Sequence, residues 1–309
     1  MLVHRRSGAE PVEVRPVTHV YKKVGPLAIK ADVYRQPDDR VRPAAVWIHG
    51  GALIMGHRAQ IDRRVKQHMT GAGYVLISLD YRLAPETKLP EIIQDLEAAF
   101  AWIRLDGPQL FKIDPARIAV IGGSAGGYLT LASGFRVEPP PNVLMSLWGY
   151  GDLIGDWYKK PSSHPRHNER KVTREKAYGQ ESGPAISDSR YRNGDGGLFY
   201  QYCRQTGTWP KEVAGWDPRA EAQRFRPFMP IENVTAAYPP TVLIHGTEDT
   251  DVPYEQSKMM AERFKQHNVS HELISVPEAE HGLAGADSQL VESAYAKAFA
   301  FVDRHLRVE

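Results

Sequence analysis

Residues 117–127 read RIAVIGGSAGG, and this stretch decides the fold. An apolar run leads without a break into Gly122-Gly123-Ser124-Ala125-Gly126. Small residues two positions before and after a serine are what a sharp reversal between a strand and a helix requires. Such a reversal holds the serine in a strained backbone conformation and exposes its hydroxyl at the edge of a sheet. The pattern therefore makes Ser124 the candidate nucleophile.

Apolar runs alternate with helical patterns on both sides of this stretch. Short, largely apolar runs are typical of strands buried on both faces of a parallel sheet, and they occur at residues 44–48, 74–79, 143–148 and 241–244; a further strand is predicted at residues 271–276. Helical patterns occupy residues 61–69, 91–105, 128–135, 254–267 and 288–305. Residues 12–24 and 27–34 alternate as two antiparallel strands turned at Gly25-Pro26. The order predicts an α/β fold with a mostly parallel sheet covered by helices.

The alternation stops after the strand predicted at residues 143–148. A return between neighbouring parallel strands needs roughly 20–40 residues, and the gap that follows is about twice as long. It is rich in aromatic side chains, which a disordered linker would lack. We therefore expect a core from residues 1–149 and 238–309, with residues 150–237 inserted as an ordered cap.

Composition excludes several classes of protein. Lys and Arg number 39 against 37 Asp and Glu, so no overall field attracts nucleic acid or an anionic membrane. A single cysteine, Cys203, excludes an intrachain disulfide, and no apolar run reaches the ~18 residues that a membrane span needs. Residues 1–15 show no apolar run typical of a secretory signal. We expect a cytoplasmic protein, and the sequence leaves its oligomeric state open, a homodimer included.

A second glycine-rich turn, His49-Gly50-Gly51-Ala52, follows the buried strand predicted at residues 44–48. An oxyanion needs two or three fixed N–H donors, and a Gly-Gly step lets backbone amides turn inward without a side chain in the way. We assign this role to the amides of Gly51 and Ala52, together with the amide of Ala125 after the candidate nucleophile. We expect His49 to bond the loop backbone.

A base and its acid are predicted after the last two strands. His281 lies before Gly282 on the loop after the last strand, and Glu248, Asp249 and Asp251 compete on the turn after residues 241–244. Spacing from the strand end favours Asp249, with Asp251 in reserve as a turn or helix-cap residue. Most of the other histidines are expected to be solvated (His68, His164, His167, His267), and His245 to be a scaffold residue. The order Ser124, Asp249, His281 matches one known order of a catalytic triad.

These motifs identify the chain as similar to the α/β-hydrolase superfamily, and within it to hormone-sensitive-lipase-like carboxylesterases and feruloyl-esterase-like relatives. The resemblance covers residues 41–150 and 238–305, and it includes Asp80-Tyr81-Arg82-Leu83-Ala84-Pro85-Glu86. It implies hydrolysis of a small-molecule ester through an acyl-enzyme, without metal or cofactor. It also implies that residues 80–86 brace the loop near the oxyanion hole.

Two features depart from the lipase-like group. Ala52 stands where that group usually has a third glycine, and the N-terminus has strand patterns where that group commonly builds part of its cap from helices. Three other functions stay open: an amidase or peptidase of the same fold, a carbohydrate acetyl or feruloyl esterase, and a catalytically inert ligand-binding protein.

Overall fold

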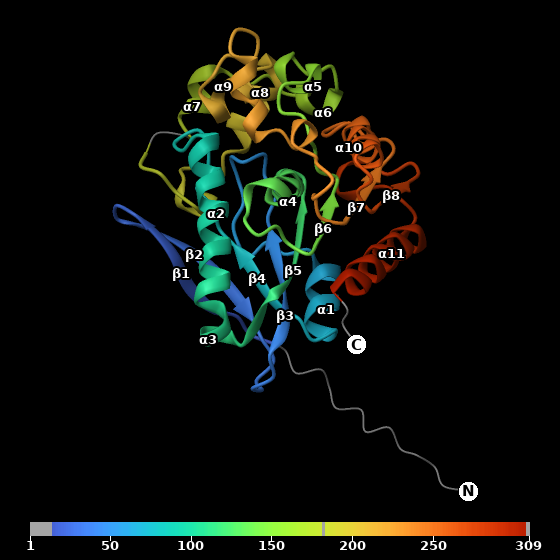
Figure 1. Ribbon diagram of the computed structural model, residues 1–309. Coiled ribbons are helices and arrows are strands. Elements are labelled where there is room, and N and C mark those ends of the chain that lie inside the picture. Colours follow the sequence, from blue (N-terminus) through green and yellow to red (C-terminus); the bar gives the residue numbers. More distant parts are fainter. Residues whose placement is uncertain (1–13, 181–182, 307–309) are drawn as a thin grey trace, which may run out of the picture.

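One eight-stranded sheet runs through the computed structural model, which describes residues 14–180 and 183–306 (Figure 1). The strands are β1 (Val17–Val24), β2 (Leu27–Tyr34), β3 (Arg42–Ile48), β4 (Val75–Leu79), β5 (Ile113–Gly123), β6 (Val143–Leu147), β7 (Thr241–Gly246) and β8 (His271–Val276). Their order in space is β1-β2-β4-β3-β5-β6-β7-β8. The strands β1 and β2 are antiparallel to their neighbours, and the other pairs are parallel.

Helices cover both faces of this sheet. They are α1 (Arg63–Gly71), α2 (Leu89–Leu105), α3 (Gly107–Phe111), α4 (Ala125–Arg136), α10 (Glu255–Gln266) and α11 (Ser288–Leu306). One hydrophobic core packs α2, α4 and α10 against the sheet, and a second core packs α1 and α11 against the other face. Strands β4 and β6 are buried at every residue, as the apolar runs predict for a sheet covered on both sides.

The segment between β6 and β7 forms a separate layer. It holds α5 (Asp156–Lys159), α6 (Pro165–Asn168), α7 (Arg174–Tyr178), α8 (Gly197–Thr206) and α9 (Trp209–Ala214), with 3₁₀ turns at Ser189–Tyr191, Ala222–Arg224, Arg226–Phe228 and Pro230–Glu232. Figure 1 shows α5 to α9 gathered at one end of the molecule, above α2 and α4. Aromatic rings form the interior of this layer: Tyr158 stacks on Trp157 at 3.6 Å and on Trp209 at 3.9 Å between ring centroids.

The predicted fold class is confirmed, and the main differences are at element ends. Helix α4 begins at Ala125, directly after Ser124, instead of at residue 128, because the turn at the serine needs no intervening loop. Strand β1 begins at Val17, and residues 12 and 13 of the strand predicted at 12–24 lie outside the described residues. No helix in the described part of the chain is both long and apolar enough to cross a membrane.

Candidate active site

Ser124 lies at the turn between β5 and α4, with φ 56° and ψ −121°. A residue other than glycine seldom adopts a positive φ, and the neighbouring glycines explain how the turn is held. A Cβ on Gly122 would lie 2.8 Å from the carbonyl oxygen of Ile48, and a Cβ on Gly126 would overlap the same oxygen. The strained turn therefore depends on close contact with β3, as the sequence pattern predicts.

The loop after β3 lies against this turn. A Cβ on Gly50 would be 3.3 Å from the Cβ of Ser124, so the two backbones are in contact. Gly51 has φ 107° and Ala52 has φ 56°, and the indole of Trp209 donates to the carbonyl oxygen of Ala52 at 2.9 Å. Among the described residues, the amides of Gly51, Ala52 and Ala125 donate to no acceptor outside regular secondary structure.

His49 supports this loop from inside the core. Its side chain is fully buried, Nδ1 lies 2.8 Å from the carbonyl oxygen of Gly50, and the ring stacks on Tyr81. Burial lowers the pKa of His49 to about 4, so the ring is neutral near pH 7. The hydroxyl of Tyr81 donates to the carbonyl oxygen of His49, and Asp80 accepts from Arg58 at 2.7 Å. Residues 80–86 thus brace the loop, as the resemblance implies.

Asp249 and His281 are in direct contact. His281 Nδ1 is 2.7 Å from Asp249 Oδ2, and the other carboxylate oxygen accepts the backbone amides of Asp251 and Val252. His245 Nε2 is 3.2 Å from the same Oδ2, a contact that the sequence does not indicate. Burial raises the pKa of Asp249, but hydrogen bonds from His245 and His281 outweigh it and lower the pKa to about 2. The carboxylate is therefore charged at any pH near neutrality.

His281 is a base held between two carboxylates. Burial lowers its pKa, but the hydrogen bond to Asp249 and the charges of Asp251 and Asp249 outweigh this and raise the pKa above 6.5. Neutral His281 carries its proton on Nδ1, toward Asp249, which leaves Nε2 as the basic nitrogen.

Trp148, a residue that the motifs do not single out, lies beside both His281 and Gly123. The indole ring is 6.3 Å from the His281 ring, edge to face, and a Cβ on Gly123 would be 3.3 Å from its Nε1. In the described part of the chain, the Ser124 hydroxyl makes no hydrogen bond, to His281 or to any other group. Such contacts often tighten only when substrate is bound.

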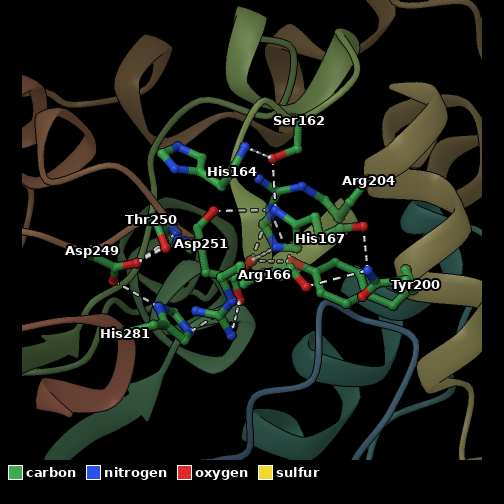
Figure 2. Close-up of polar contacts among 12 residues, drawn as sticks. Ser162, His164, Arg166, His167, Tyr200, Arg204, Asp249, Thr250, Asp251 and His281 are labelled. Carbon is green, nitrogen blue, oxygen red and sulfur yellow. Dashed lines mark hydrogen bonds and ion pairs between the residues drawn. The ribbon is translucent and has the colours of Figure 1, made fainter. Parts of the chain in front are cut away.

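Two polar residues near the site have contacts that the sequence does not indicate. Asp251 lies in the bend between β7 and α10, as expected of a turn residue, and does not cap α10, whose N-cap is Tyr254. It is buried and takes hydrogen bonds from three side chains of the inserted segment (Figure 2). The expectation that His167 is solvated is wrong, because it is 2% exposed and is one of these donors. Sequence periodicity gives no information on such contacts between the insertion and the core.

A cavity of about 450 Å³ opens beside the candidate oxyanion loop. Its lining includes Gly50, Gly51, His57, Arg190 and Asp195, and no Trp, Tyr or Phe. Within residues 14–180 and 183–306, no cluster of His, Cys, Asp or Glu could hold a metal ion.

Comparison with known proteins gives two family models and a set of relatives. A model for the alpha/beta hydrolase fold matches residues 45–182, and a model for the prolyl oligopeptidase family matches residues 198–309. The chain is 29% identical over 328 residues to the non-reducing polyketide synthase pkbA of Emericella nidulans, covering 88% of this chain and 13% of that protein. It is 28% identical over 264 residues to esterase LipC of Mycobacterium tuberculosis, covering 81% of this chain and 56% of LipC. The chain thus spans only part of the length of either relative.

Among solved structures, the acetyl ester-xyloside bifunctional hydrolase of Caldicellulosiruptor lactoaceticus has the same fold. The TM-score is 0.69 at 20% identity, with 95% of this chain and 98% of that chain covered. The strand order, the strained turn at Ser124 and both family models agree. The chain therefore has the α/β-hydrolase fold, and its sequence is similar to the families that the two models describe.

Proposed function

We propose that the protein hydrolyses carboxylic esters, with Ser124 as nucleophile, His281 as base and Asp249 as the acid that orients the base. One observation carries the proposal. The 2.7 Å contact between His281 Nδ1 and Asp249 Oδ2 joins the loops after β7 and β8, at the sheet edge where β5 ends in the strained turn at Ser124. Backbone strain of this kind clusters at active sites, which supports a functional role for Ser124.

In this mechanism the serine attacks the acyl carbonyl while Nε2 of His281 takes its proton. Asp249 keeps the remaining proton of His281 on Nδ1 and stabilises the imidazolium that forms. The alcohol leaves with the proton from His281, and water then attacks the acyl-enzyme in the same way. The low pKa of Asp249 supports this role, because a charged carboxylate stabilises the imidazolium throughout the cycle.

The amides of Gly51, Ala52 and Ala125 bind the oxyanion. Their lack of another acceptor among the described residues supports this assignment, since loop amides held by their own backbone would be occupied. Loss of one donor in such a hole costs roughly 3 kcal/mol of transition-state stabilisation.

The inserted residues 150–237 act as a cap over the site, and the substrate is a small ester with a polar alcohol group. The cavity beside Gly51 has room for such a molecule, and its lining of His57, Arg190 and Asp195 suits polar groups. We expect acyl chains of two to six carbons to be preferred.

An amidase or peptidase is the second candidate, favoured by the match of residues 198–309 to the prolyl oligopeptidase family. Both activities use the same nucleophile, base and acid.

A paired substrate series tests both candidates. We expect p-nitrophenyl acetate and butyrate to be hydrolysed with a kcat/KM at least 10²-fold above the matching p-nitroanilides, and Ser124→Ala to abolish turnover of both. A preference for the anilides would make the protein an amidase. Wild-type-like activity in a folded Ser124→Ala variant would contradict the mechanism, because the mechanism requires Ser124 as nucleophile.

A further inference from the structure

Asp251 lies where the inserted segment contacts the catalytic loops, and its two carboxylate oxygens have different surroundings (Figure 2). Three donors converge on Oδ1: His167 Nε2 at 3.0 Å, Tyr200 OH at 2.6 Å and Arg204 Nη1 at 3.0 Å. Helices α6 and α8 supply all three. Arg204 also donates to the backbone carbonyl of Asp251 at 2.9 Å. The insertion thus holds the position of this carboxylate.

The other oxygen, Oδ2, points to the catalytic base. It is 3.9 Å from His281 Nε2 and 3.8 Å from Arg166 Nη2. Both distances exceed that of a hydrogen bond, so Asp251 acts on His281 through its charge, and a carboxylate that has no proton to donate leaves the Nε2 lone pair to Ser124. A charge at this separation in a partly buried site still interacts strongly with an imidazolium.

His281 therefore faces a carboxylate on each side. Asp249 bonds Nδ1 at 2.7 Å, and Asp251 approaches the nitrogen that takes up the proton. The remaining charges near the ring are Arg166, which is 44% exposed, and Glu280, whose Oε2 lies 3.6 Å from Arg166 Nη1 and accepts the His281 amide. His245 acts through Asp249.

We propose that Asp251 is a positioning residue for the proposed hydrolysis: the inserted segment holds its charge beside His281 Nε2, where it stabilises the imidazolium, while Arg166 partly offsets that charge. The effect of Asp251 on catalysis rests on the proposed function. Its effect on the pKa of His281 does not. Burial raises the pKa of Asp251, but the hydrogen bonds from His167 and Tyr200 and the charges of His281 and Arg204 outweigh it and lower the pKa far below the usual range. The charge is therefore present at every pH at which the enzyme would work.

Two substitutions should shift the pKa of His281 in opposite directions. Asp251→Asn removes a negative charge near Nε2 and should lower the pKa by about one unit. Arg166→Gln removes a positive charge that faces both Asp251 and His281, and should raise the pKa by about half a unit. The wild-type value should lie above 6.5.

The measurement is an NMR titration of ¹⁵N-histidine-labelled full-length protein, with the His281 resonances identified by their loss in His281→Gln. It reports the pKa whether or not the protein hydrolyses esters. The acid limb of kcat/KM for p-nitrophenyl acetate should then move with the NMR values. If no ester is hydrolysed, the proposed function fails, while the NMR titration still decides the electrostatic inference.

Matched controls separate charge from structure. Asp303→Asn removes a carboxylate that likewise serves a histidine and a tyrosine, His68 and Tyr74, and should leave the His281 pKa unchanged. Asp251→Glu keeps the negative charge, so the His281 pKa in this variant should lie closer to the wild-type value than to the value in Asp251→Asn. If Asp251→Asn does not fold, the His281 pKa in Arg166→Gln tests the inference by itself, because the Arg166 side chain is exposed and its replacement should not disturb folding. If folded Asp251→Asn and Arg166→Gln both have a His281 pKa within 0.2 unit of the wild-type value, the inference is overturned.

Discussion

Asp249 and Asp251 are two residues apart, yet they have separate environments. Asp249 has two partners on one carboxylate oxygen, the buried His245 and the partly exposed His281. Asp251 is held by the inserted segment and reaches His281 only at 3.9 Å. In the proposed mechanism, hydrogen-bond geometry at Nδ1, and not proximity alone, favours Asp249 over Asp251 for the orienting role.

Substitution of these two carboxylates should give unequal losses. Asp249→Asn should lower kcat by about 10⁴-fold, because an amide at this position no longer keeps the productive tautomer of His281. Asp251→Asn should lower kcat at high pH by less than about tenfold, since the imidazole stays oriented. Steady-state kinetics on p-nitrophenyl acetate measure both, and thermal unfolding checks that each variant is folded. A larger loss in Asp251→Asn would exchange the two roles.

At the scale of elements, the turn from β5 to α4 is fixed by contact with β3. The glycines on either side of Ser124 leave room for the backbone of Ile48, and Ser124 itself carries a strained φ that costs roughly 1–3 kcal/mol. This part of the site could be predicted from the sequence, because close backbone packing leaves a clear pattern of small residues. The contact between Trp148 and His281 could not, since it joins two loops far apart in the chain.

A pair of glycine substitutions tests this packing. Gly126→Ala should lower the free energy of unfolding by about 2–3 kcal/mol or more, because its Cβ would overlap the carbonyl oxygen of Ile48. Gly71→Ala, at the last residue of α1 with open space around it, should be neutral or stabilising by up to about 1 kcal/mol. Urea unfolding of both variants gives the comparison. Equal stabilities would contradict the close approach of β3 and the turn.

For the whole molecule, the sheet was predictable and the inserted segment was not. Strands β4 and β6 are buried at every residue because helices cover both faces of the sheet, and the apolar pattern of such strands is local in the sequence. The insertion instead folds around rings such as Tyr158 and Trp209 and donates to Asp251 from α6 and α8. These contacts have no sequence period, so neither the buried state of His167 nor the polar lining of the cavity could be predicted.

The central claim is that Ser124 is a nucleophile activated by His281 and Asp249. Treatment with a fluorophosphonate, followed by proteolysis and mass spectrometry of the labelled peptide, tests it most directly, because only an activated serine reacts rapidly. We predict a single adduct on Ser124 in the wild type, labelling at least 10³-fold slower in His281→Gln, and none at this position in Ser124→Ala. Rapid labelling of another residue, or ester hydrolysis that persists with Ser124 unlabelled, would contradict the account.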